Sequence, residues 1–187
     1  YKSAARVFDD MDEAKAWIEG RILKDAAGTL KETRAIEDPE TPLELSEIDL
    51  FRGRKKETLD ALDAHLEKVS FAKGAKLFSR GDSGAHLFFV RKGLVALMLP
   101  VGQARSRRIS TCGRGSFFGE AGFLDGDAHT TDAVALTDVE VFVLSRANLD
   151  AFAELHKKAA FSLIAGLARI VADRVRFLTD ELVATEA

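Results

Sequence analysis

The residues with the clearest chemistry lie in one short segment, which reads Gly115-Ser-Phe-Phe-Gly-Glu-Ala-Gly-Phe-Leu124. A strand that stops at Gly119 and turns into a short helical segment exposes successive backbone N–H groups, and such groups bind phosphate. Glu120 lies inside that turn, where its carboxylate is a poor neighbour for phosphate but a good acceptor for a ribose hydroxyl. The two features together predict a site for a sugar phosphate.

Other patterns that could carry chemistry lack the spacing that the chemistry requires. Gly81-Asp-Ser-Gly84 is interpreted as a turn, since a catalytic triad also needs a positioned base and a buried acid. The run Gly113-Arg-Gly-Ser-Phe-Phe-Gly119 misses the spacing of the dinucleotide fingerprint. The histidines do not show the spacing of a metal site; they are His65, His86, His129 and His156. We therefore expect no catalytic residue, no metal and no required cofactor.

The composition is typical of a packed, soluble protein, with 47% of the 187 residues hydrophobic and 30% charged. The 27 lysines and arginines against 30 acids give a net charge of −3, which argues against a general attraction to nucleic acid or lipid phosphate. The cluster of Arg105, Arg107 and Arg108 is expected to be a solvated hairpin tip. The single cysteine, Cys112, excludes an internal disulfide. No stretch approaches the roughly 18 to 20 apolar residues of a membrane-spanning helix.

The elements that must position the Gly115–Leu124 segment follow from the periodicity of the sequence. An apolar stripe predicts an amphipathic helix over about 9–24, and two of the three prolines mark a linker at about 28–42. A second helical stretch is expected from 43 to about 68, with a break around Gly53. Short runs of Phe, Val, Leu and Ile between glycines over 69–144 predict an antiparallel sandwich or barrel of about eight strands.

The chain returns to helix after Arg146. A short helix is expected first, followed by a longer one over about 157–182. The longer helix carries an apolar stripe of Ile164, Leu167, Ala168, Val171, Val175, Leu178 and Leu182. Such a stripe needs a partner surface, which is either the chain's own domain or the same helix of a second copy. The pattern leaves these two alternatives open, and a homodimer through this helix is one of them.

Three runs of residues resemble the cyclic nucleotide-binding domain family, and the resemblance extends over about 43–180. The runs are Lys73-Gly74-x-x-Leu77-Phe78-x-x-Gly81-Asp82, Leu87-Phe88-Phe89-Val90-x-x-Gly93-x-Val95 and Gly115-x-Phe117-Phe118-Gly119-Glu120. The resemblance implies a mainly β domain at 43–187, an eight-stranded antiparallel β-roll of the jelly-roll type with N-terminal helices and a long C-terminal helix. It also implies a phosphate-binding cassette, a cyclic nucleotide such as cAMP or cGMP as ligand, and flanking helices that move when ligand binds.

The same resemblance implies which residues bind the ligand. The backbone at Gly119 and Ala121 would approach the cyclic phosphate, and Glu120 would accept a hydrogen bond from the ribose 2′-hydroxyl. The other positions that match the family's pocket are Phe118, His129, Thr130, Thr131, Leu97, Leu99, Ile109 and Ser110.

One position departs from the family's pattern. The family carries an arginine about nine residues after the glutamate, where this chain has His129, followed by Thr130 and Thr131. Arginine is permanently charged and can grip phosphate with two parallel bonds, whereas histidine has an ordinary pKa near 6.5. Losing a charge-assisted bond weakens binding by about ten- to a hundred-fold.

This departure has consequences for the expected ligand. The site is expected to bind cyclic nucleotide weakly, to prefer another ligand or to bind none. His129→Arg is expected to tighten any cAMP or cGMP binding. The alternative for His129 is an exposed loop residue with no part in binding.

The first residues carry a second resemblance. Val7-Phe8-Asp-Asp-Met11-Asp-Glu-Ala14-x-x-Trp17-Ile18-Glu is similar to the last helix of a STAS domain, the module that ends sulfate permease (SulP) anion transporters. Residues 1–27 are assigned to it. It implies a regulatory module attached to the STAS and transporter part of the same chain, at the cytoplasmic face of the bacterial inner membrane, and soluble as this fragment.

Two alternatives to a transporter-attached sensor stay open. The roll could be degenerate and serve as a scaffold or dimerisation domain, or it could sense for an unlinked partner protein. A nucleic-acid partner is not expected, because residues 157–187 leave no room for a helix-turn-helix after the long helix.

Overall fold

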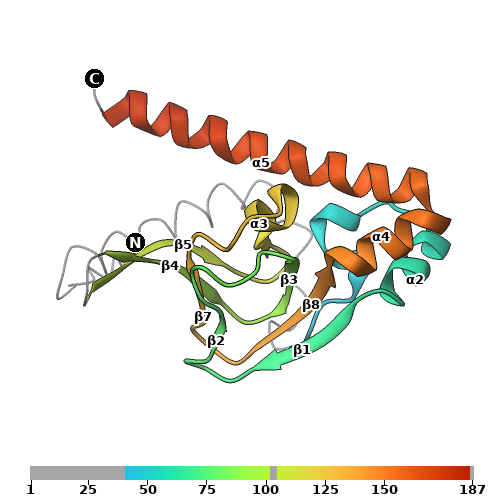
Figure 1. The fold of residues 1–187 in the computed structure, drawn as a ribbon, viewed down its shortest axis with the longest axis horizontal. Helices are drawn as coiled ribbons and strands as arrows, with labels where there is room; N and C mark the ends of the chain where they lie inside the picture. The colour runs from blue at the N-terminus through green and yellow to red at the C-terminus, as the bar shows by residue number, and fades with distance from the viewer. Residues whose placement is uncertain (1–40, 102–104, 186–187) are drawn as a thin grey trace, which may run out of the picture. The chain divides into compact units, whose positions relative to one another are not determined.

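The computed structural model describes residues 41–101 and 105–185, with side chains described up to residue 176 except at 105. In this part of the chain, eight strands form two four-stranded antiparallel sheets, with helical segments before and after them (Figure 1). The predicted fold class, a mainly β roll with flanking helices, is confirmed. The STAS-like helix at 1–27 and nearly all of the linker at 28–42 lie outside the described residues.

The two sheets are built from strands that are far apart in sequence. The first sheet has the order β1 (Glu67–Phe71), β8 (Val139–Ser145), β3 (His86–Lys92) and β6 (Phe117–Phe118). The second has the order β2 (Lys76–Phe78), β7 (Asp132–Ala135), β4 (Val95–Val101) and β5 (Arg105–Cys112). Because β6 pairs with β3 at the end of this order, the segment that follows β6 is fixed at the edge of the first sheet.

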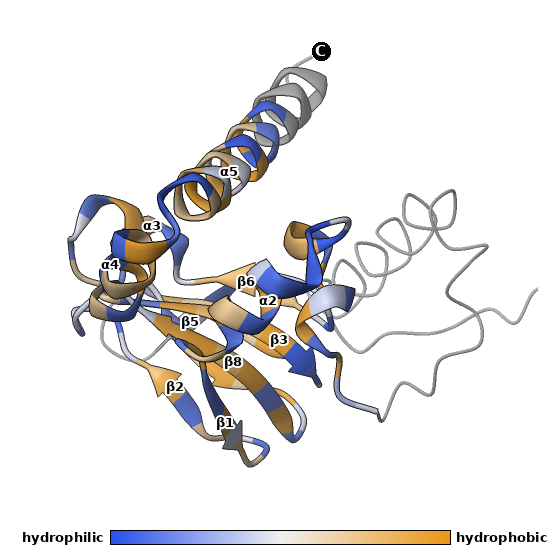
Figure 2. Cartoon of the chain, turned by 90° about the vertical axis from the view of Figure 1, so that its right-hand side faces the viewer, coloured by the Kyte–Doolittle hydropathy of each residue, from blue (hydrophilic) through white to orange (hydrophobic). Residues whose placement is uncertain are grey.

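The first sheet is covered on both faces, which explains why its strands are apolar at successive positions. Alternate residues of a strand point to opposite faces. In β3, Leu87 and Phe89 pack in the cluster beneath the helices, whereas Phe88 and Val90 pack in a second cluster between the sheets. Figure 2 accordingly shows the strands coloured mainly as hydrophobic, while helix α5 carries both hydrophobic and hydrophilic residues.

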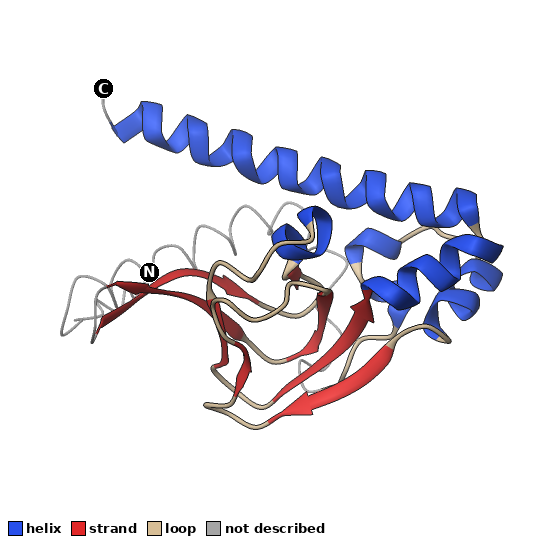
Figure 3. Cartoon of the chain, viewed as in Figure 1, coloured by secondary structure: helices blue, strands red, loops and turns tan. Residues whose placement is uncertain are grey.

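The helical elements differ from expectation before the roll and agree with it after the roll (Figure 3). They are the 3₁₀ turns η1 (Leu45–Glu47) and η2 (Asp49–Phe51), followed by α2 (Lys56–Asp63), α3 (Glu120–Asp125), α4 (Arg146–Leu155) and α5 (Lys157–Thr185). The helix predicted over 43–68 is thus wrong in extent: Ile48 is extended between two short turns, and α2 ends at Asp63. The residues after it turn into β1, because there they pair with β8.

The N-terminal segment, residues 43–51, is anchored to the first sheet by Arg91 of β3. Arg91 Nε donates to the Leu43 carbonyl at 2.9 Å, and Leu43 N donates back to the Arg91 carbonyl at 3.1 Å. The buried guanidinium also lies over the ring of Phe142 at 4.7 Å and pairs with Glu140 at 3.2 Å. A buried cation is stable only when it is paired and hydrogen-bonded, so these contacts fix the segment in place.

The first half of α5 is anchored to the same segment and to Arg54, which follows it. Arg54 donates to the side-chain and backbone oxygens of Ser162, each at 3.1 Å. Gly166 allows a close approach, because a Cβ there would lie 2.9 Å from Leu50 Cδ1. Leu163 and Leu167 of α5 are buried in the core cluster. This half of α5 therefore packs on its own domain.

Candidate functional site

The cassette begins where β6 ends. Gly119 has φ +84°, a left-handed conformation that glycine adopts without strain, and there the chain turns into α3. A Cβ on Gly119 would also lie 2.9 Å from the His86 carbonyl oxygen. No side chain caps α3, and the first N–H groups of a helix have no acceptor within the helix. The predicted strand-to-helix turn at Gly119 is therefore present.

A cavity of about 100 Å³ lies beside this turn. Of the residues predicted to bind ligand, seven line it: Leu97, Gly119, Glu120, Ala121, His129, Thr130 and Thr131. Ligand pockets commonly have roughly 300 to 1,000 Å³. The hollow that the predicted site requires exists, but it is smaller than a whole nucleotide needs.

Four predicted residues are not among those that line the cavity. Phe118 is fully buried and stacks on Phe88 with ring centroids 5.1 Å apart, so it belongs to the core. Ile109 is 55% exposed, and Ser110 beside it is exposed as well. Leu99 follows a shift of register between Leu97 and Met98 in the pairing of β4 with β5. After such a bulge the alternation of strand residues changes face, which explains why Leu99, which the resemblance places in the pocket wall with Leu97, does not line the cavity.

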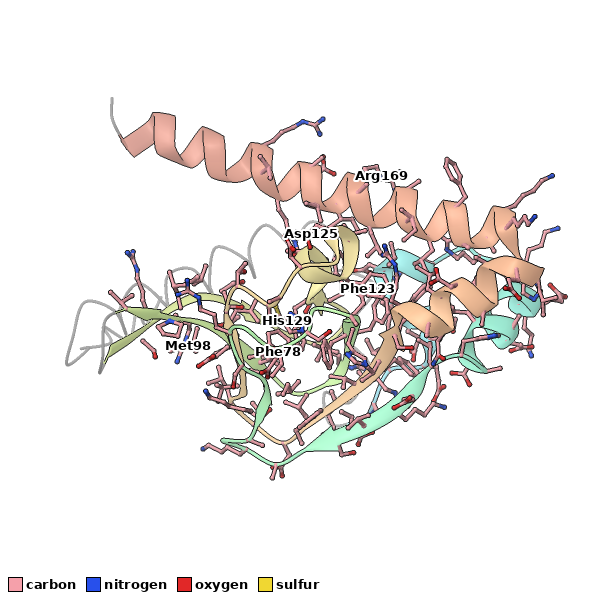
Figure 4. All side chains as sticks on the ribbon, in the orientation of Figure 1. Phe78, Met98, Phe123, Asp125, His129 and Arg169 are labelled. Carbon is pink, nitrogen blue, oxygen red and sulfur yellow. The ribbon has the colours of Figure 1, made fainter. Side chains whose placement is uncertain are left out.

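His129 is buried and is held by its backbone and its ring. Its N–H donates to the Asp82 carbonyl at 2.9 Å, and its carbonyl accepts from Gly81 N at 2.8 Å. The imidazole stacks on Phe78, with ring centroids 3.6 Å apart and planes at 11° (Figure 4). The loop-residue alternative for this histidine is therefore wrong, because only 5% of it is exposed.

Burial also sets the charge of His129. Removal from water lowers the pKa of His129 below its ordinary value of 6.5. The nearby carboxylate of Asp82 opposes this effect, and His86 adds to it. Because desolvation is the largest cause, the imidazole is neutral at pH 7. The position that carries an arginine in the family pattern therefore carries no charge here.

A glycine pair holds α3 against the loop between β2 and β3. A Cβ on Gly84 would lie 2.2 Å from the Asp127 carbonyl oxygen and 2.6 Å from Gly122 Cα. A Cβ on Gly122 would lie 2.8 Å from Gly84 Cα. Real Cβ atoms do not approach a backbone this closely, so only glycine fits at both positions. Because Gly122 lines the cavity, this contact fixes that part of the cavity wall.

Glu120 links the cavity to α5. Arg174 Nη1 donates to Glu120 Oε1 at 2.8 Å, and Arg174 Nη2 donates to the Phe117 carbonyl at 3.2 Å. The guanidinium lies over the Phe117 ring, 4.6 Å from its centroid. One wall residue of the cavity is thus tied directly to the C-terminal helix.

Three residues of this site were missed by sequence reasoning. Phe78 lines the cavity and belongs to the first run that resembles the family. Its place in a strand just before the turn at Gly81 could have indicated a position in the site. Gly122 follows Ala121 in the cassette and also lines the cavity. Arg174 had no signal in the sequence, because it lies 54 residues from its partner Glu120.

The described residues offer no second centre of chemistry. No group of three His, Cys, Asp or Glu side chains among them could hold a metal ion. Burial raises the pKa of Cys112 to about 11, so its thiol is protonated at neutral pH.

In the described part of the chain, α5 and the other helices are too short or too polar to span a membrane. Arg107 and Arg108 are exposed on β5, near the turn end of the β4–β5 hairpin, in agreement with the expected solvated hairpin tip.

Comparison with curated proteins gives a family and two kinds of relative. Residues 68–156 match the family model for the cyclic nucleotide-binding domain. The chain is 31% identical over 120 residues to the Cyclic AMP receptor protein of Thermus thermophilus, which is 64% of this chain and 56% of that protein. It is 29% identical over 170 residues to Glutaminase 1 of Bradyrhizobium diazoefficiens, 91% of this chain and 26% of that protein. The chain thus spans between about a quarter and just over half of these relatives.

Solved structures show the same fold. The crystal structure of Thermus thermophilus Catabolite Activator Protein matches with a TM-score of 0.64 and 28% identity, over 73% of this chain and 62% of that chain. The N-terminal domain of a transcriptional regulator from Streptomyces coelicolor A3(2) matches with a TM-score of 0.62 and 27% identity, over 77% and 96%. Residues 68–156 of this chain thus resemble the cyclic nucleotide-binding domain family, and the two sheets and the turn at Gly119 agree with that resemblance.

Proposed function

We propose that residues 43–187 form a regulatory module in which a small ligand, held in the cavity beside Glu120 and His129, changes the position of α5. The ion pair between Glu120 and Arg174, at 2.8 Å, is the observation that supports this proposal. A ligand hydroxyl that takes Glu120 as acceptor competes with Arg174 for the same carboxylate. A ligand shifts a conformational equilibrium only by its preference for one state, and this competition supplies that preference.

A thermal-shift screen tests whether the cavity binds anything. The panel contains cAMP, cGMP, adenosine and guanosine. A ligand at 100 times its dissociation constant stabilises the native state by about 2.7 kcal/mol, which for a unit of this size raises Tm by roughly 5 to 10 °C. If the panel gives no shift at saturating concentrations, the sensor function is excluded. The roll is then a degenerate scaffold, as in the alternative stated in the sequence analysis.

The coupling between the cavity and α5 leads to a separate prediction. Replacing Arg174 by methionine removes the donors to Glu120 and the Phe117 carbonyl, so the middle of α5 is expected to open more often. Partly exposed ion pairs contribute up to about 1 kcal/mol, which corresponds to amide hydrogen exchange up to about fivefold faster near residue 174 and in α3. Arg176→Met is the matched control, because Arg176 pairs with Asp173 of its own helix. Equal exchange in the two variants contradicts the proposed link.

A homodimer through α5 stays a proposal, and the structure makes it more specific. Ile164, Leu167 and Ile170 face the domain itself. The exposed apolar residues follow the 4,3 spacing of a coiled-coil seam, as Phe161, Ala165, Ala168, Ala172 and Val175. We propose that this seam packs against the same seam of a second copy.

A charge in this seam tests the dimer. Ala172→Glu places a carboxylate within the proposed contact, where it would be buried without a partner, so dissociation is expected to rise at least tenfold. Light scattering after size exclusion measures the mass. Asp173→Lys is the control, because residue 173 lies beside the seam. A monomeric unaltered protein at about 100 μM, or a dimer that tolerates Ala172→Glu, excludes this contact.

The larger protein that contains the module is a further proposal. Attachment to a SulP transporter, at the cytoplasmic face of the bacterial inner membrane, stays a prediction, because the STAS-like residues lie outside the described part of the chain. The match to Glutaminase 1 spans 170 residues, more than residues 43–187 contain, so it extends into the first 42 residues. This favours an amide-hydrolysing enzyme as the attached part over a transporter.

The sequence of the whole gene separates these contexts. An enzyme region upstream, with glutamine hydrolysis by the full-length protein, supports attachment to an amide-hydrolysing enzyme. A long upstream region of membrane spans supports attachment to a transporter. The expected absence of a nucleic-acid partner also stays a prediction, since one structural relative is described as the domain of a transcriptional regulator. A DNA-binding region adjoining the module in the gene would contradict it.

A further inference from the structure

The cavity has an unusual charge for a phosphate site. Among the described residues that line it there is one ionised side chain, the carboxylate of Glu120, and neither lysine nor arginine. The guanidinium of Arg174 is directed at Glu120 and the Phe117 carbonyl and does not line the cavity. An anion placed here would meet a carboxylate without a cation of its own to pair with, and burying an unpaired charge is costly.

His129 does not supply the missing charge. It is 5% exposed and stacked on Phe78 at 3.6 Å, and desolvation keeps it neutral at pH 7. The charged groups that act on it are Asp82, which favours its protonation, and His86, which opposes it. A neutral imidazole presents one donor and one acceptor nitrogen, and these suit an uncharged ligand.

The imidazole also occupies space beside the cassette turn. Its Cε1 lies 3.5 Å from the point where a Cβ of Gly119 would be. The ring edge therefore lies against the turn that a phosphate would have to approach. At about 100 Å³ the cavity is small for a ligand pocket, so a phosphate ring fused to the sugar would have to lie where the imidazole edge meets the turn.

The polar groups that remain are those that bind hydroxyls. Glu120 accepts from Arg174 through Oε1, and a ligand hydroxyl that donates to this carboxylate competes with Arg174 for it. Thr130 and Thr131 add two hydroxyls to the wall, each able to donate and to accept. Hydroxyl-rich ligands match this set without any compensating charge.

We infer that the ligand of this cavity is an uncharged ribosyl compound, a nucleoside, rather than a cyclic nucleotide. The inference rests on the proposed sensor function, because it names the ligand of the same site. Glu120 accepts from a ribose hydroxyl, the threonine hydroxyls and His129 contact the remaining hydroxyls, and the base lies toward the mouth of the cavity. The base is not specified by the wall, so adenosine and guanosine are the probes.

Calorimetry with residues 1–187 at pH 7 compares adenosine and guanosine with cAMP and cGMP. Each nucleoside is expected to bind at least tenfold more tightly than its cyclic phosphate. Tighter binding of cAMP or cGMP overturns the inference but leaves the sensor function intact. Binding of none of the four overturns both the inference and the sensor function.

Two variants assign the effect to the cavity. His129→Arg is expected to tighten cAMP binding by about ten- to a hundred-fold, because the fork adds a charge-assisted bond, and to weaken adenosine binding. His156→Arg is the matched control, since it makes the same substitution at a histidine that does not line the cavity. If His129→Arg does not fold, Glu120→Gln serves instead: it is expected to weaken adenosine at least tenfold. Unchanged adenosine binding in Glu120→Gln overturns the assigned site.

Discussion

Replacing Phe89 by alanine is expected to lower the free energy of unfolding by about 3 to 5 kcal/mol, a greater loss than we expect from any other single substitution named above or below. Phe89 is fully buried, and its ring lies 5.1 Å from that of Phe51 and 6.3 Å from that of Phe117. It therefore joins the N-terminal segment to the strand that leads into the cassette. Truncation leaves a cavity that these neighbours cannot fill, because each is fixed by its own strand or turn. Urea denaturation measures the loss.

The matched control for Phe89 is Phe161. The same substitution removes the same atoms, but Phe161 is 76% exposed on α5. Phe161→Ala is expected to change the free energy of unfolding by less than about 0.5 kcal/mol in the monomer. A loss below about 1 kcal/mol for Phe89→Ala would mean that this cluster is not the stabilising core.

The second large effect is expected at Gly84. In Gly84→Ala the new methyl group would lie 2.2 Å from the Asp127 carbonyl oxygen and 2.6 Å from Gly122 Cα, and neither backbone atom can yield without moving α3. Overpacking of this kind costs about 1 to 3 kcal/mol. Because the displaced helix forms the cavity wall, binding of any ligand found by the thermal-shift screen is expected to fall at least tenfold. Denaturation and calorimetry measure the two effects.

Gly113→Ala is the control for Gly84→Ala. A Cβ at residue 113 would meet only Leu94 Cδ2, at 3.3 Å, and that side chain is 42% exposed and can turn away. Its effect on unfolding is expected to stay below about 0.5 kcal/mol. Equal losses in the two variants would show that the Gly84–Gly122 contact has no special role.

The strands could be predicted from sequence because glycines mark where the chain must turn. At Gly93, for example, φ is +86° and a Cβ would lie 2.3 Å from the Asp138 carbonyl oxygen, so the glycine is required by both conformation and space. The stretch from 43 to 68 was harder to predict. Its leucines at 59 and 62 are buried in a helix as expected, but β1 forms directly after α2 because it pairs with β8, about 70 residues away. Local periodicity contains no information on such a pairing.

Some features of the candidate site could likewise be predicted from the sequence, and others could not. Glu120 and His129 were predicted to share a site from their places in the cassette, and the structure brings both to one cavity. The stack of His129 on Phe78 and the pair between Glu120 and Arg174 depend on contacts between distant segments. Whether the site binds a nucleotide, a nucleoside or nothing is set by burial and charge at His129, which the residue type alone does not reveal.

The anchoring of Arg54 to Ser162, and of Leu50 to Gly166, has a consequence for biosensor design. A fluorophore attached just before Leu43 would report on the base of α5 alone, because both are fixed to one rigid support. A dye placed beyond Arg174, paired with another on the outer strand β1, would instead register the swing of the distal half of the helix.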